Sequence, residues 1–149
     1  MLKSEPQGAS RSNQPMVNKT ILVVDDEPSV RKVCEEVLRF HNFECILASN
    51  GEQGFEAYCQ RHSDICLVLS DVSMPVMGGI EMATKLFAMH SHVNVILMSG
   101  YNMSDIVPDD VRKLCSVIPK PFTSNALIAA VRKCLKYDDD RLADAASSI

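Results

Sequence analysis

Apolar residues gather in short runs along this chain, and polar residues fill most of the segments between them. Runs of four to six residues rich in apolar and β-branched side chains are typical of strands. Five such runs are present: TILVV (20–24), ECILAS (44–49), ICLVL (65–69), NVILM (94–98) and SVIP (116–119). A run that is apolar throughout, such as 65–69, is expected of a strand buried on both faces of a parallel sheet.

The segments between these runs show the spacing of amphipathic helices. After the first run, apolar residues recur at i, i+3, i+4, i+7 and i+8, which form one face of a helix; they are Val30, Val33, Cys34, Val37 and Leu38. Pro28 suits the first turn of that helix. Three further helices are predicted in the same way, beginning after residues 50–51, at residues 78–79 and near residues 123–124.

The segment 102–115 is less regular, because Pro108 interrupts its helical spacing. A proline inside a helix costs about 3 kcal/mol, whereas one at the helix start is well tolerated. Asp109 and Asp110 would then occupy the first turn, where the helix dipole favours acidic side chains. The sequence therefore predicts a loop or single turn at 102–107 and a helix over 108–115. Pro119 cannot donate to a neighbouring strand, so 116–119 is predicted to be an edge strand.

Alternating strands and helices make five βα units, and this order predicts an α/β fold. We expect a doubly wound, five-stranded parallel sheet with helices on both faces. Residues 1–18 and 138–149 are poor in apolar side chains and are predicted to be tails, the second with a frayed helical piece. The folded unit is then 19–137, with no output domain after it. Ligands of such sheets bind beyond the carboxyl ends of the strands.

Composition excludes several classes of protein. With 149 residues, of which 46% are hydrophobic, the chain is long enough for one domain with a proper core. A net charge of −4 argues against direct binding to nucleic acid. The six cysteines show no CxxC pair and no metal-binding spacing with histidine, which predicts reduced thiols and a cytoplasmic location. No signal peptide and no membrane-spanning run are recognisable.

Polar residues that could carry chemistry stand where the apolar runs end. They are Asp25, Asp26, Asp71, Ser99 and Lys120. Each has an ordinary alternative as a solvated turn or surface residue, but in a parallel sheet all five would meet at one edge. Crowded carboxylates raise one another's pKa unless a cation neutralises them, and Mg²⁺ prefers such oxygen ligands. A carboxylate can also act as a nucleophile toward phosphorus, and a lysine suits a phosphoryl oxygen.

Four motifs together carry a resemblance to a known family. ILVVDDE, LVLSDVSMPVMGG, VILMSGY and PKPF, in this order, resemble the receiver domain of two-component response regulators over about residues 19–136. The SGY form is similar to receivers of hybrid histidine kinases and of some single-domain regulators. The resemblance implies the flavodoxin-like strand order 2-1-3-4-5.

The resemblance also implies a role for each acidic residue. Asp71 would be the phosphoacceptor. Asp25 and Asp26 would bind Mg²⁺ together with Asp71, and Ser73 would add its backbone carbonyl as a further metal ligand.

Beyond the acids, the resemblance implies a switch hydroxyl at Ser99 and a phosphoryl-contacting ammonium at Lys120, followed by a cis peptide bond to Pro121. One position departs from the usual pattern. Many receivers have Tyr or Phe three residues before the lysine, where this chain has Val117. Tyr101 is expected to shield the phosphoryl group or to take over part of the coupling.

The partners follow from the same resemblance. A histidine kinase or a histidine-containing phosphotransfer protein would donate the phosphoryl group, and an unidentified downstream protein would read the switched surface. Phosphorylation and dephosphorylation would be self-catalysed, so the chain would not be an enzyme in the usual sense. Whether it forms a homodimer through its last strand and helix is left open.

Three other classes of protein share parts of this pattern. A phosphatase of the haloacid-dehalogenase type needs D-x-D, but Ser73 occupies the second acidic position. A flavodoxin relative needs a phosphate-binding loop after the first strand, where Asp25, Asp26 and Glu27 would repel a flavin phosphate. A degenerate receiver that acts only as an interaction module stays open because of Val117.

Overall fold

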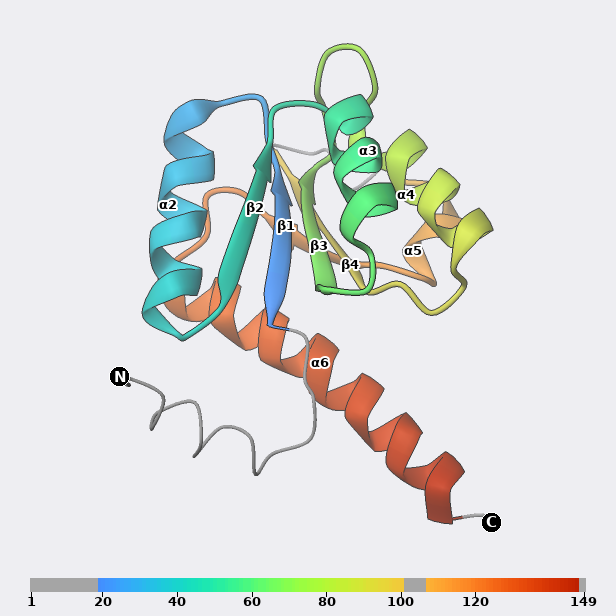
Figure 1. Cartoon of the computed structure of the whole chain (residues 1–149). Helices are drawn as coiled ribbons and strands as arrows, with labels where there is room; N and C mark the ends of the chain where they lie inside the picture. Colours follow the sequence, from blue (N-terminus) through green and yellow to red (C-terminus); the bar gives the residue numbers. More distant parts are fainter. Residues whose placement is uncertain (1–18, 101–106, 148–149) are drawn as a thin grey trace, which may run out of the picture.

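A computed structural model describes residues 19–100 and 107–147, with side chains described as far as residue 135 (Figure 1). Strands and helices alternate along the chain as predicted. In order they are β1 (Thr20–Val24), α2 (Pro28–Phe40), β2 (Glu44–Ala48), α3 (Gly51–Arg61), β3 (Ile65–Asp71), α4 (Gly79–Met89), β4 (Val95–Ser99), α5 (Asp109–Arg112), β5 (Ser116–Pro119) and α6 (Ser124–Ser147).

The sheet has the predicted topology. Its five strands are parallel and lie in the order β2-β1-β3-β4-β5. This order confirms that β5, which contains Pro119, is an edge strand. β3 continues two residues beyond the predicted run, so Asp71 is the last residue of the strand itself.

Two hydrophobic clusters cover the two faces of the sheet. Leu22 and Val24 of β1 belong to the cluster that includes residues of α3, α4 and α5. Ile21 and Val23 belong to the other cluster, which includes residues of α2 and α6. Alternate side chains of a strand point to opposite faces, and all four are fully buried. Burial on both faces explains why the run is apolar without alternation.

The later helices depart from the predicted boundaries. α5 is shorter than the predicted 108–115, because the N–H groups of Leu114 and Cys115 both bind the Val111 carbonyl in a turn that leads into β5. α6 continues to Ser147 through most of the segment predicted to be a tail. Residues 138–147 contain neither proline nor glycine, so nothing in the sequence ends the helix there.

Some sequence predictions concern parts of the chain outside the described residues. These are the tail at 1–18, most of the loop at 102–107, and Tyr101. All six cysteines lie within the described residues, and none of them forms a disulfide bond. Over the described residues, none of the helices combines the length and the apolar character needed to cross a membrane.

Candidate metal and phosphoryl-transfer site

Three carboxylates meet at the carboxyl edge of the sheet. Val24 pairs with Ser70 across β1 and β3, so the residues that follow them, Asp25 and Asp71, are neighbours at the strand ends. Ligand oxygens of Asp25, Asp26 and Asp71 all lie within 4.8 Å of one another. Asp25 is fully buried and Asp71 is 7% exposed, whereas Asp26 is open to solvent. The strand register therefore brings together the acids that the sequence predicted.

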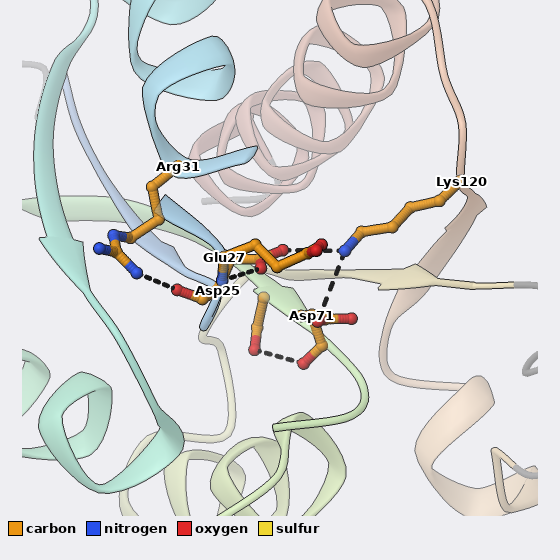
Figure 2. Close-up of polar contacts among 6 residues, drawn as sticks. Asp25, Glu27, Arg31, Asp71 and Lys120 are labelled. Atoms are coloured by element: carbon orange, nitrogen blue, oxygen red, sulfur yellow. Dashed lines mark hydrogen bonds and ion pairs between the residues drawn. The ribbon is translucent and has the colours of Figure 1, made fainter. Parts of the chain in front are cut away.

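Hydrogen bonds hold Asp25 in place from several sides (Figure 2). Its backbone N–H donates to the Ala48 carbonyl over 3.1 Å. Its carboxylate accepts from the Glu27 backbone N–H over 2.9 Å, and its carbonyl accepts from Arg31 Nη1 over 2.7 Å. Sequence reasoning did not identify Arg31, and no motif distinguishes it; it is an arginine in the first turns of a helix that starts at the site.

Lys120 reaches the acids from the end of β5 (Figure 2). Its Nζ lies 2.9 Å from Asp25 Oδ2 and 3.4 Å from Asp71 Oδ2. Its backbone N–H donates to the Ser99 carbonyl over 2.7 Å, which ties Lys120 to the last residue of β4. Ser99 is buried, and the peptide bond from Lys120 to Pro121 is cis.

Close backbone packing positions the segment that follows Asp71. Gly79 opens α4, and its N–H donates to the Val72 carbonyl over 2.9 Å. A Cβ atom at Gly79 would overlap the Asp71 carbonyl oxygen, so no larger residue fits there without movement. Ser73, which the sequence predicted as a metal ligand, is exposed, and its backbone N–H lowers the pKa of Asp71.

Burial and charge set the electrostatics of the site. Burial raises the pKa of Asp71, the Asp25 charge raises it further, and Lys120 opposes both effects. Burial also pulls the pKa of Lys120 down, but the hydrogen bond and charge of Asp25, with a contribution from Asp71, raise it overall. Three carboxylates and one ammonium leave a formal charge of −2. This charge and the oxygen donors fit one hard divalent cation.

Val117 lies on the edge strand β5. It pairs with Leu97 of β4 and packs, partly buried, against the cluster that contains Val107 and Val111. The position that is aromatic in many receivers is therefore filled here by a small, partly buried side chain.

Fold and site together define a receiver domain, and comparison with known proteins agrees. The chain belongs to the response regulator receiver domain family, whose model matches residues 21–132. Receiver domains of this family work with histidine kinases and phosphotransfer proteins in two-component systems.

Individual relatives cover most of the chain. It is 30% identical over 122 residues to sporulation initiation phosphotransferase F of Bacillus subtilis, covering 80% of this chain and 96% of that protein. It is 30% identical over 117 residues to the chemotaxis protein CheY of B. subtilis, with 77% and 96% coverage. Several other relatives are longer proteins, of which the chain spans between 25% and 56%.

A solved structure shares both the fold and part of the sequence. The response regulator TrrA of Thermotoga maritima, in complex with Mg²⁺ and a beryllium fluoride, superimposes with a TM-score of 0.70 at 30% identity. The match covers 78% of this chain and 99% of that one.

Proposed function

We propose that this chain is a phosphoacceptor receiver, in which Asp71 accepts a phosphoryl group from a histidine kinase or a histidine-containing phosphotransfer protein. One observation supports this most strongly. The Asp71 carboxylate ends the central strand β3, with two further acids within 4.8 Å and an ammonium 3.4 Å away. Asp25, Asp26 and Asp71, with the Ser73 carbonyl, would hold Mg²⁺.

The proposed transfer is a single displacement at phosphorus. A carboxylate oxygen of Asp71 forms the new P–O bond, while the P–N bond to the donor imidazole breaks and its electron pair returns to the ring nitrogen. Bound Mg²⁺ would neutralise charge on the phosphoryl oxygens. Lys120 would contact one of these oxygens as a point charge, and the Ser99 hydroxyl would donate a hydrogen bond to another.

Phosphorylation would then change the balance of charge at the site. It adds about −1.5 to −2 charges beside Asp71, which draws the Lys120 ammonium away from Asp25. The backbone N–H of Lys120 donates a hydrogen bond to the Ser99 carbonyl, so the ends of β4 and β5 would move together. We infer that this shifts the equilibrium between two conformations of the surface formed by β5 and its flanking segments. A downstream protein would bind one of these conformations.

The proposal also includes the extent of the domain and its cellular location. Residues 19–137 would form the receiver unit, and both phosphorylation and dephosphorylation would be self-catalysed without turnover of a separate substrate. Six cysteines without a disulfide bond among them support a cytoplasmic location.

Labelling with acetyl phosphate tests the phosphoacceptor assignment. With Mg²⁺ present, intact-mass spectrometry should show one added phosphoryl group on the wild type and none on Asp71→Asn. Asp64→Asn is a matched control, because Asp64 is an exposed acid that precedes β3 at its other end. Equal labelling of wild type and Asp71→Asn would refute the assignment.

Beryllofluoride separates an active receiver from an interaction module. An active receiver should show NMR shifts at Ser99 and Lys120 on titration with beryllofluoride and Mg²⁺. Absence of these shifts would favour the degenerate receiver, the alternative that the small side chain at Val117 supports.

A further inference from the structure

Two histidine rings meet at the edge of the sheet opposite the carboxylates. His62 is the C-cap residue of α3 and His90 is the C-cap residue of α4, two helices that pack side by side (Figure 1). The ring centroids of His62 and His90 lie 4.7 Å apart, with 45° between the ring planes. The seven residues of β3 separate this pair from Asp71 by about 20 Å, so the two sites are distinct.

The spacing of the rings suits a shared ligand. Two imidazoles that bind one Zn²⁺ ion in a tetrahedral arrangement have ring centroids roughly 5 Å apart, given the usual Zn–N distance. Simple aromatic packing explains the same distance. His62, however, is exposed and His90 only half-buried, so both rings are accessible from solvent. Both also lie at helix C-termini, where the helix dipole favours positive charge.

Tyr58 gives His90 the environment of a metal ligand. The Tyr58 hydroxyl lies 3.2 Å from His90 Nδ1, and the tyrosine itself is 5% exposed. In the tautomer in which Nδ1–H donates to this hydroxyl, Nε2 carries the free lone pair. Histidine ligands of metals commonly have such a partner on their other nitrogen, which sets the tautomer and the ring orientation.

Sulfur donors lie next to the rings on the same helices. Cys59 Sγ is 3.9 Å from Met89 Sδ, and these residues adjoin Tyr58 and His90 in the sequence. Cys59 and His62 are three residues apart on α3 and so share one face of the helix. Among the described residues, only the acid trio holds three His, Cys, Asp or Glu ligand atoms within 4.8 Å. The histidine pair is therefore the centre of the candidate site, and the exposed Cys59 would have to turn from Met89 toward it.

We propose that His62 and His90 bind a borderline-soft divalent cation such as Zn²⁺, with Cys59 as a third ligand and Tyr58 as the residue that positions His90. Nitrogen and sulfur donors select such ions, whereas oxygen donors select Mg²⁺. The proposal is independent of phosphorylation at Asp71.

Zn²⁺ titration of the full chain, followed by the NMR signals of the histidine rings, tests the proposal. An Asp26→Asn background weakens competition from the carboxylate site. We expect the His62 and His90 signals to shift together with one binding constant, while His41 stays in place. Tyr58→Phe removes only the hydroxyl and should weaken binding about tenfold without loss of the fold. His62→Gln and His90→Gln should each weaken it further.

His92→Gln is the matched control. His92 is two residues from His90 and lines a cavity together with Lys133 and Cys134, which His62 and His90 do not line. Zn²⁺ affinity that is unchanged in His62→Gln, or lowered as much by His92→Gln as by His62→Gln, would overturn the proposal. Parallel shifts of the His41 signals would also overturn it, because they indicate binding to any exposed imidazole.

Discussion

The ammonium of Lys120 lies closer to Asp25 than to Asp71, with Nζ–Oδ2 distances of 2.9 and 3.4 Å. Asp25 is the more deeply buried of the two acids and depends more on a charged partner. Asp71 therefore shares its only ion-pair partner among the described residues, and its pKa is raised. This arrangement leaves Asp71 poorly compensated until a cation or a phosphoryl group changes the charges around it.

Replacing Asp71 should make the protein more stable. Because burial and the Asp25 charge raise the pKa of Asp71 above its ordinary value of 3.8, its ionisation opposes the folded state as pH rises from that value through the folded pKa. Asp71→Asn should unfold at a higher urea concentration than the wild type at pH 7 without Mg²⁺. The expected gain in the free energy of unfolding is about 1 kcal/mol. The difference should shrink as pH falls below 3.8. A difference that does not change with pH would contradict this explanation.

Removing the Lys120 charge should be strongly destabilising. Lys120→Met would leave the fully buried Asp25 carboxylate without its ammonium partner, and breaking such a pair costs about 3 kcal/mol or more. Urea denaturation at pH 7 measures the loss. Lys32→Met is the control, because Lys32 forms an exposed ion pair with Glu36 and should change stability by less than about 0.5 kcal/mol. Equal effects of the two substitutions would show that Asp25 does not need Lys120.

Mg²⁺ should stabilise the protein through the acid trio. At a concentration of 100 times its Kd, a ligand that binds only the folded state adds about 2.7 kcal/mol. Thermal melts with and without Mg²⁺ should show this gain in the wild type and its loss in Asp26→Asn. Asp26 is exposed, so its replacement should leave the metal-free melting temperature almost unchanged. Full Mg²⁺ stabilisation of Asp26→Asn would exclude this carboxylate as a ligand.

Adding a methyl group at Gly79 should disturb both stability and the site. The new Cβ would overlap the Asp71 carbonyl oxygen, and forced packing of this kind costs about 1–3 kcal/mol. Gly78→Ala is the control, because a Cβ at Gly78 would lie 3.0 Å from the Val72 carbonyl oxygen, a tight contact that a shift of a few tenths of an ångström relieves. We expect slower acetyl phosphate labelling of Gly79→Ala than of Gly78→Ala at a temperature where both are folded. Equal stability and labelling of the two variants would show that α4 adjusts freely.

Much of the fold was predictable because burial leaves a local signature in the sequence. The runs at 20–24 and 65–69 are apolar throughout because both of their faces are covered. Pro119 indicated an edge strand because it lacks an N–H donor. The ends of α5 and α6 were less predictable. The end of α5 depends on hydrogen bonds in the turn that follows it, and the end of α6 depends on helix propensity in residues beyond the hydrophobic core.

The sequence by itself determined the order of strands and helices, the edge at which the polar residues gather, and the family resemblance. Only the tertiary structure decided that Lys120 lies nearest to Asp25 and that Arg31 donates to the Asp25 carbonyl. It alone also decided that the rings of His62 and His90 are in contact. Periodicity records which face of an element is buried, and each element carries that information in its own residues. Distances between side chains far apart in the chain depend instead on strand register, helix packing and rotamers, which no single segment encodes.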